Sequence, residues 1–381
     1  MKILIGADIV PVKSNMQDFE NENIDALLLN GLKTIFDSAD YRICNLEVPL
    51  TDKETPILKC GPSLRASVAS AAGIKALGID FLTLANNHIL DHGESGLRST
   101  MQVLEETGIG YAGAGMNPEQ AGKPYIVEKC GRKIGIYCCA EHEFSIVEEG
   151  KPGANPFDPL ESLDHISALK KQCDYTIVLY HGGKEQYRYP APYLQKVCRK
   201  IIEKGADLVI CQHTHCIGCE ETYLNGTIVY GQGNFLFDDM NNEYWATSLL
   251  VQIELDEDVN VSYIPLEKHG ASVALAQEKK EKIMSDFRQR SEEIKQPGFI
   301  EKKYNEIAAS ELERYLYMLQ GRRYKSYLFR VLNKLSGYRL ITWAFQHQYK
   351  RNDLPSLINI MDCEVHRECF LQALKKKIIG E

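Results

Sequence analysis

The chain has 381 residues and a formal net charge of −8, and its 44% hydrophobic and 25% charged residues are ordinary for a globular protein with room for about two domains. It contains no run of 18 or more apolar residues, so we expect no membrane span, and its short, early-charged start does not resemble a secretory signal peptide. Several of the twelve cysteines lie within apolar runs, which predicts buried thiols in a reducing cytoplasm rather than a disulfide framework.

The first 270 residues alternate between short apolar runs, which predict strands, and stretches with helical spacing of apolar residues. Repeated strand–helix–strand units followed by antiparallel strands predict a two-sheet α/β sandwich. In chain order, we expect strands at 3–5, 41–44, 81–85, 175–180, 208–212, 226–237, 246–255 and 259–265, a hairpin at 124–127 and 133–139, helices at 23–38, 64–77, 94–108, 158–173 and 192–204, and a loop at 51–62.

The character of the sequence changes after about residue 270, where strand patterns give way to helical spacing. We therefore expect two parts, an α/β domain over 1–270 and a mostly helical region over 271–381. Helices are predicted at 279–293, 302–319 and 327–335.

The charge is distributed unequally between these two parts. Residues 271–381 contain 21 Lys and Arg against 14 Asp and Glu, a net charge of +7, so that 1–270 carries −15. An acidic first part suits a cation site, and a basic tail suits a partner or a polyanion, although solvated helix faces explain the tail as well. The aromatic and basic residues of 314–351 also fit nucleic-acid binding, the less favoured interpretation.

Five of the expected strands end in side chains that can bind a metal ion. The carboxyl ends of parallel strands meet at one edge of a sheet, so these side chains are expected to converge. Histidine nitrogens with carboxylate or amide oxygens suit zinc, manganese or iron. The strand ends carry Asp8, Glu47, Asn87 with His88, His181, and His213 with His215.

Six spaced motifs resemble one family. They are Gly6-Ala-Asp8-Ile-Val-Pro, Asn45-Leu-Glu47, Ala85-Asn-Asn-His88-x-x-Asp91-x-Gly93, His181-Gly-Gly-Lys-Glu185, Gln212-His213-Thr-His215 and Gly233-Asn234-Phe235. In this order they resemble the CapA-type proteins of bacterial capsule and poly-γ-glutamate synthesis, within the calcineurin-like metallophosphoesterase superfamily. The resemblance covers about 1–240 and implies a four-layer αββα sandwich with a metal centre at the strand ends.

The resemblance also implies one or two divalent metals (Zn, Mn or Fe) and their ligands. Glu47 would bridge two metals, with Asp8 and His215 completing one ligand set, and Asn87, His181 and His213 completing the other. A shared carboxylate is physically reasonable because two cations about 3.5–4 Å apart repel each other.

The same motifs suggest the residues that act on a substrate. His88 is expected to protonate a leaving group, the alternative being a structural hydrogen-bonding histidine. Asp91 would orient the imidazole, cap the following helix, or do both. Glu185, Tyr187 and Asn234 are expected to bind substrate, although Glu185 could equally be a surface residue.

Two positions depart from the superfamily pattern. Val10 stands where Asp-x-His would place a histidine, so one metal loses a nitrogen ligand. Ile89 follows His88, and the acidic residue of the motif is displaced to Asp91. These departures count against ordinary phosphodiesterase activity.

The leading hypothesis is a metal-dependent hydrolase of the CapA type that acts on a phosphoester or a γ-glutamyl amide. The alternative is a non-catalytic, metal-binding accessory protein of capsule or polymer synthesis. A small molecule or a polyanionic polymer is the expected substrate, and capsule-synthesis proteins are the expected partners. The −15 charge of 1–270 favours a small substrate, or a polymer bound through the basic tail.

Overall fold

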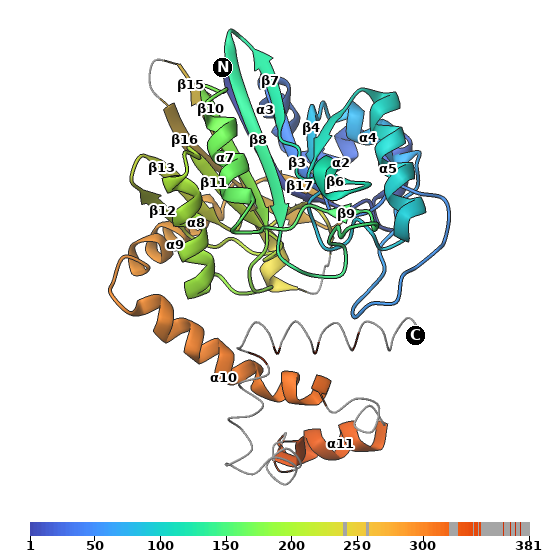
Figure 1. Ribbon diagram of the computed structural model, residues 1–381, viewed down its shortest axis with the longest axis vertical. Helices are drawn as coiled ribbons and strands as arrows, with labels where there is room; N and C mark the ends of the chain where they lie inside the picture. The colour runs from blue at the N-terminus through green and yellow to red at the C-terminus, as the bar shows by residue number, and fades with distance from the viewer. Residues whose placement is uncertain are drawn as a thin grey trace. The chain divides into compact units, whose positions relative to one another are not determined.

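The computed structural model describes residues 1–238, 242–256, 259–319, 327–337, 339–341 and 343, with the single residues 361, 366, 370 and 374 (Figure 1). The chain forms two compact units, Met1–Glu301 and Lys302–Glu381. Both large sheets and all the predicted site residues belong to the first unit.

The first sheet has the strand order β2-β17-β16-β15-β1-β3-β4-β5, with β14 also paired to β1. Its centre is β1 (Lys2–Ile9), which runs parallel to β3 (Tyr41–Leu46) and antiparallel to β15 (Thr247–Leu255). The other strands are β2 (Leu28–Leu29), β4 (Phe81–Thr83), β5 (Gly110–Ala112), β14 (Asn234–Leu236), β16 (Val259–His269) and β17 (Ser272–Leu275).

The second sheet has the order β12-β13-β11-β10-β8-β7. Its central strands β10 (Tyr175–His181) and β11 (Leu208–Gln212) are parallel and buried at every residue, as expected for a sheet covered on both faces. The other strands are β7 (Tyr125–Lys129), β8 (Arg132–Ala140), β12 (Glu220–Tyr223) and β13 (Gly226–Tyr230), while β6 (Ala114–Gly115) and β9 (Gly153–Ala154) form a separate small pair.

The two sheets pack face to face through one apolar core that includes Ile5 of the first sheet and Ile177 of the second. Gln212 and Gln232 connect them further by donating amide hydrogen bonds to the carbonyl oxygens of Gly6 and Ile5, at 3.3 and 2.9 Å. Helices cover the outer faces, so the predicted four-layer αββα sandwich is confirmed (Figure 1). The first sheet carries α1 (Met16–Glu20), α2 (Ile24–Leu27), α3 (Leu32–Asp37), α4 (Ser70–Ala76) and α5 (Gly93–Thr107), and the second carries α7 (Ser162–Lys170) and α8 (Pro192–Glu203).

Several expected elements differ from the structure in their extent. The helix expected over 23–38 is interrupted, because Leu28–Leu29 pair with β17 and both Asn30 and Gly31 adopt left-handed backbone angles. The strand expected over 226–237 is two strands in different sheets, β13 and β14, since the chain crosses between the sheets at Gly231 and Gly233. The helix expected over 64–77 begins only at Ser70.

The compact first unit extends about thirty residues beyond the boundary expected near 270. The strand β17 completes the first sheet, and α9 (Lys280–Glu293) packs on β12 and β16. Phe287 of α9 is buried and its ring lies 4.8 Å from that of Tyr263. These apolar contacts explain why a segment with helical spacing belongs to the sandwich.

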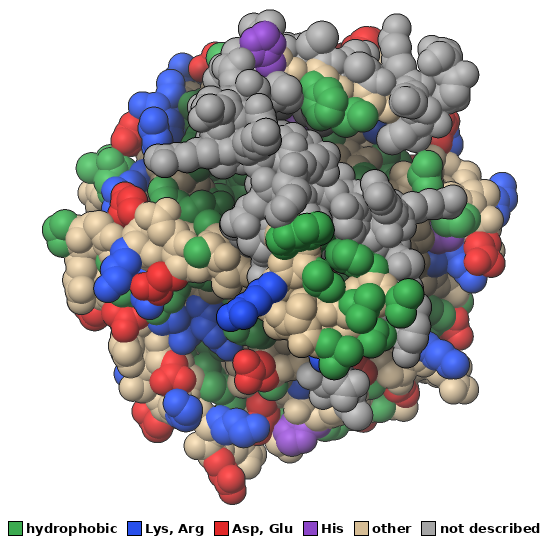
Figure 2. All heavy atoms as spheres, turned by 90° about the horizontal axis from the view of Figure 1, so that it is seen from below, with side chains coloured by type: hydrophobic (Ala, Val, Ile, Leu, Met, Phe, Trp, Pro, Cys, Tyr) green, Lys and Arg blue, Asp and Glu red, His purple; other side chains and the backbone are tan. Residues whose placement is uncertain are grey.

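The second unit is helical in its described part, as expected. It contains most of α10 (Phe299–Leu319) and all of α11 (Tyr327–Leu335). Leu328, Leu332 and Leu335 of α11 are exposed. Separately, the space-filling view of one face of the molecule shows several groups of hydrophobic side chains (Figure 2). Much of 314–351 lies outside the described residues. None of the described helices has the length and apolar character needed to cross a membrane.

Candidate metal centre

The ends of strands from both sheets meet at one place and bring the six predicted metal ligands together. Asp8 of β1 lies level with Asn45 of β3, and His181 of β10 lies level with Gln212 of β11, so the carboxyl ends of these parallel strands are aligned. All six side chains are buried although all are polar: Asp8, Glu47, Asn87, His181, His213 and His215.

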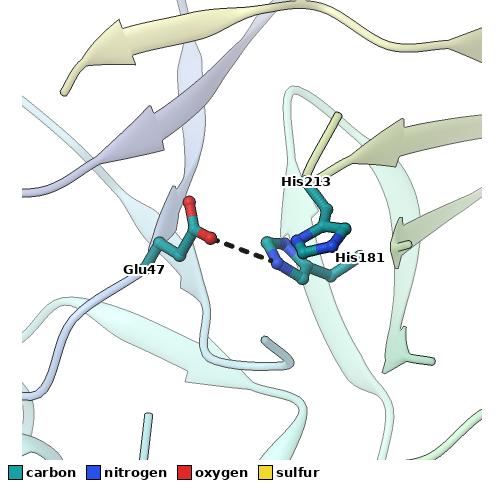
Figure 3. A group of neighbouring side chains, drawn as sticks. All are labelled: Glu47, His181 and His213. Atoms are coloured by element: carbon teal, nitrogen blue, oxygen red, sulfur yellow. Dashed lines mark ion pairs between the residues drawn. The ribbon is translucent and has the colours of Figure 1, made fainter. Parts of the chain in front are cut away.

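Glu47, Asn87, His181 and His213 form one side of the centre. Figure 3 shows the Glu47 carboxylate facing the imidazoles of His181 and His213. The His181 Nε2 atom lies 3.3 Å from Glu47 Oε1 and 3.0 Å from Asn87 Oδ1. Ligand atoms on one tetrahedral ion with bonds of about 2.0–2.1 Å are separated by about 3.3 Å. The spacing therefore matches atoms that share a cation.

Asp8, Glu47 and His215 form the other side, with ligand atoms within 4.8 Å of one another. His215 Nδ1 lies 2.8 Å from Asn234 Oδ1, an acceptor, so a proton stays on Nδ1 and Nε2 is the atom left to bind a metal once the ring is neutral. The ring of Trp245 packs 4.8 Å from the His215 ring and fixes its plane.

Buried polar atoms without partners test whether these residues fit a metal. Asp8 Oδ2, both Glu47 carboxylate oxygens and His213 Nδ1 have no hydrogen-bond partner among the described residues. Burying a carboxylate without compensation is costly, and a divalent cation would supply that compensation. The donor set, with two carboxylates, one amide and three imidazoles, fits zinc, manganese or iron.

The carboxylates and imidazoles of the centre shift each other's pKa values. Burial favours the neutral form of Glu47, but His215 and His181 outweigh it and hold the pKa of Glu47 well below its usual range. Burial also opposes the charged form of His215, yet Glu47 and Asp8 raise the pKa of His215 to about 9. Protons on the histidines thus offset the carboxylate charges where a metal cation would otherwise do so.

The turn that carries His213 and His215 is strained. Both residues adopt left-handed backbone angles, with φ of 87° and 51°. Such conformations are unfavourable for residues other than glycine, and they recur at functional sites. Gly231 (φ 117°) packs against this turn, and a Cβ there would lie 2.6 Å from Thr214 Oγ1. The surrounding structure therefore holds the two imidazoles in place.

His88 and Asp91 form the predicted pair beside the centre. His88 Nδ1 lies 2.6 Å from Asp91 Oδ2, which orients the ring, and the His88 charge acts on both Glu47 and His213. Asp91 is fully buried and accepts further hydrogen bonds from Lys59 Nζ at 2.5 Å and the Leu64 amide at 2.6 Å. The alternative role of Asp91 as a helix cap is not seen, because His92 holds the cap position of α5.

Sequence reasoning did not find Lys59, whose side chain is only 3% exposed. It lies in the expected 51–62 loop, where no periodic pattern distinguishes one residue from another.

Asn45 and Asn86 were also missed as site residues. Asn45 donates to Asp8 Oδ1 at 2.7 Å and accepts from Asn86 at 3.0 Å, so the two amides connect the first sheet to the ligands.

Glu141 and Glu143 were missed as well, although they follow the end of β8 as the other site residues follow their strands. Glu141 Oε1 lies 3.5 Å from His213 Nε2, and the Gly183 amide donates to its other oxygen at 3.0 Å. Glu143 Oε2 accepts from the Asn87 amide at 2.9 Å. Each glutamate therefore orients one predicted ligand.

The three residues expected to bind substrate occupy different surroundings. Glu185 is exposed, with a carboxylate oxygen within 4.8 Å of ligand atoms of His213 and His215. Tyr187 is buried, with its ring 5.9 Å from that of Tyr189. Asn234 is fully buried behind His215. Their contact with a substrate stays a prediction.

The chain matches a family of known proteins. Residues 2–239, more than half of the chain, match the family model described as bacterial capsule synthesis protein PGA_cap. The chain belongs to this family. The family resemblance read from the six motifs is thereby confirmed.

Relatives within the capsule synthesis family include two from Bacillus. The PGA biosynthesis protein CapA of Bacillus subtilis (strain 168) is 28% identical over 261 residues, which cover 64% of this chain and 65% of that protein. The capsule biosynthesis protein CapA of Bacillus anthracis is 28% identical over 234 residues, which cover 58% of this chain and 56% of that protein. The chain thus spans less than two thirds of the length of these relatives.

Among solved structures, a novel phosphatase from Mycoplasma pneumoniae is similar with 16% identity and a TM-score of 0.45, over 71% of this chain and 94% of that one. A hypothetical protein from Thermus thermophilus is similar with 14% identity and a TM-score of 0.46, over 70% of this chain and 100% of that one.

Proposed function

We propose that this member of the capsule synthesis family is a metal-dependent hydrolase. The observation that carries the proposal is the convergence of the buried Asp8 and Glu47 carboxylates with three imidazoles, beside an oriented His88–Asp91 pair; Asp8 Oδ2 and both Glu47 oxygens accept no hydrogen bond from the described residues. A structural metal site would have no need of this pair. The proposed ligands are Glu47 between two sets, Asp8 with His215, and Asn87 with His181 and His213.

A divalent cation bound there would polarise a substrate oxygen and lower the pKa of water towards 7. The protein's own contribution is orientation and proton transfer. Asp91 accepts from His88 Nδ1, so His88 Nε2 is the atom that donates a proton to the leaving group. Lys59 Nζ lies 2.5 Å from Asp91 Oδ1 and 3.2 Å from His88 Nδ1, so this cation sits beside the pair and helps to hold the Asp91 carboxylate in place.

The substrate classes supported by this arrangement are a phosphoester and a γ-glutamyl amide, since hydrolysis of either needs a polarised oxygen and a protonated leaving group. Glu143 and Glu185 place further negative charge beside His213, and Glu141, whose pKa burial raises to about 7, adds a partial charge at neutral pH. Such a rim repels a long polyanion and favours a small substrate or one polymer end. We propose capsule-synthesis proteins as partners, in line with the family, and a cytoplasmic location, in line with buried free thiols such as Cys211.

The test compares wild type and His88→Ala on a panel of phosphodiester, phosphomonoester and γ-glutamyl substrates, with metal content measured on both. We expect an active wild type and a mutant that keeps its metals but loses about 100- to 10,000-fold in kcat, the usual contribution of general acid catalysis. His269→Ala, which removes an exposed histidine outside the centre, is the matched control and should keep full activity.

The alternative, a non-catalytic accessory protein, has one observation in its favour. A relative from Mycobacterium tuberculosis (strain ATCC 25618 / H37Rv), 28% identical over 214 residues that cover 53% of this chain and 56% of that protein, is named a probable polyglutamine synthesis accessory protein. A metal-loaded wild type that hydrolyses no member of the panel would contradict the hydrolase and support this role.

A further inference from the structure

Two arginines bind consecutive residues just after the turn that carries the predicted histidine ligands. Arg188 Nη1 donates to the Ile217 carbonyl at 3.0 Å, and Arg290 Nε of α9 donates to the Gly218 carbonyl at 2.7 Å. A Cβ at Gly218 would lie 3.3 Å from the Arg188 carbonyl oxygen, so the backbone of Arg188 also packs against the residue that Arg290 binds. Two positive side chains are thus held close to each other.

Neither guanidinium forms an ion pair with a carboxylate in the part of the chain that the structure describes. The two acidic residues nearest to Arg290 along α9 have other partners, because Asp286 pairs with Lys282 at 3.0 Å and Glu293 accepts from Tyr189 at 2.5 Å. Each guanidinium has five N–H donors and gives one to a carbonyl, so donors remain for a ligand.

The two cations also disfavour each other. Burial, and after it the charge of Arg188, lowers the pKa of Arg290 from its usual value. An anion bound between the guanidinium groups would offset this repulsion and accept strong, charge-assisted hydrogen bonds.

The arginine pair borders the predicted metal centre. The Arg188 guanidinium lies over the ring of Tyr244 at 5.0 Å, and the following residue, Trp245, packs 4.8 Å from the His215 ring. Arg188 also lies three residues after Glu185, whose carboxylate is within 4.8 Å of a ligand atom of His215. Both arginines are partly exposed, so a molecule at the open side of the centre has access to them.

We propose that Arg188 and Arg290 form a binding site for an anionic group of the substrate, a carboxylate or a phosphate, apart from the bond that is broken. This rests on the proposed function and names the substrate class, a small anion or one end of an anionic polymer. The planar guanidinium fork matches two oxygens of either group. Because Glu143 and Glu185 repel negative charge elsewhere around His213, the pair also sets the direction in which the substrate lies.

The experiment measures anion binding by the full chain after EDTA treatment and desalting, so that no metal ion binds the probe. Wild type, Arg188→Met and Arg290→Met are titrated with inorganic phosphate and with glutarate in a calorimeter. We expect saturable binding of at least one probe by wild type, and binding about 10- to 100-fold weaker in each variant, the usual effect of losing hydrogen bonds to a charged group. The probe that binds more tightly identifies the anionic group as phosphate or carboxylate.

Arg188→Lys and Arg290→Lys keep the charge but lose the planar fork, and their affinities should lie between those of wild type and the Met variants. They also decide the question if loss of a carbonyl contact prevents a Met variant from folding. Arg98→Met removes an exposed arginine of α5 and is the matched control, which should bind the probes as wild type does. Glutaramide, the neutral analogue of glutarate, should not bind.

A wild type that binds neither probe would overturn the proposal, as would variants at both arginines that bind the probes as tightly as wild type. Failure of the proposed hydrolase is a separate result, because it would be a chain that hydrolyses no substrate and still binds anions through these arginines.

Discussion

Raising the pH from 7 to 9 is expected to strengthen metal binding at this centre markedly. The reason is that a metal must displace a proton from His215, whose pKa the neighbouring Glu47 and Asp8 raise to about 9 against the effect of burial. About half of the His215 side chains are unprotonated at pH 9 and about one in a hundred at pH 7. Apparent affinity should therefore differ about 50-fold, or about 2.3 kcal/mol. The raised pKa of His181 adds to the difference in the same direction.

The metal-free protein should respond to pH in the opposite sense. Because the pKa of His215 is raised above its usual value near 6.5, its contribution to stability is fully present below pH 6.5 and is lost as the pH rises through about 9. The shift corresponds to about 3 kcal/mol. The difference in Tm between metal-loaded and EDTA-treated protein should thus widen from pH 7 to pH 9.

Competition with a chelator of known pH dependence gives the affinity, and calorimetry of loaded and EDTA-treated samples gives the Tm difference. His269→Gln removes a histidine outside the centre and should leave both pH dependences unchanged. An affinity that is the same at pH 7 and pH 9, after correction for the chelator, would refute the proposed competition between metal and proton at His215.

Three further substitutions test other parts of the site. Lys59→Met removes the buried cation from Asp91 and should lower the free energy of unfolding by about 3 kcal/mol, measured with urea, because one partner of a buried ion pair is left behind. Asn234→Ala frees the His215 ring and should weaken metal binding about 10- to 100-fold in chelator competition. Gly231→Ala places a Cβ against the histidine turn and should cost about 1–3 kcal/mol of stability, measured by thermal unfolding, together with metal affinity.

Each of these has a control in the same unit. Lys53→Met and Asn225→Ala alter exposed residues and should be nearly neutral. Gly131 has a positive φ of 70° but open space around it, so Gly131→Ala measures backbone strain without a clash. If Lys59→Met, Asn234→Ala or Gly231→Ala had the same stability and metal affinity as its control, the prediction for that residue would be contradicted.

Sequence patterns were sufficient to predict the fold and the convergence of the strand-end side chains, because both depend on local regularities. A buried strand such as β11 is an uninterrupted apolar run, and the polar residues that end such strands must meet at one edge of the sheet. The same rule, applied to β8, would have found Glu141.

Other features depend on tertiary contacts that no local pattern records. Leu28 and Leu29 have helical spacing with their neighbours, yet pairing with β17, more than 240 residues later, makes them a strand. Nothing in the sequence distinguishes Lys59 from other loop residues, because its role depends on the contact with Asp91 that forms in the folded chain. The fit of α9 against Tyr263 likewise places the end of the sandwich beyond the point where the sequence changes character.

The pairing of β1 with β15 has a consequence for how the protein matures. The strand β1 is a central strand of the first sheet, and its antiparallel neighbour β15, Thr247–Leu255, is synthesised near the end of the same unit. Until then an apolar strand edge stays open, and closing so long a loop is slow. Nascent chains that stop before residue 247 should therefore depend on chaperones, because the first sheet still lacks a neighbour for its central strand.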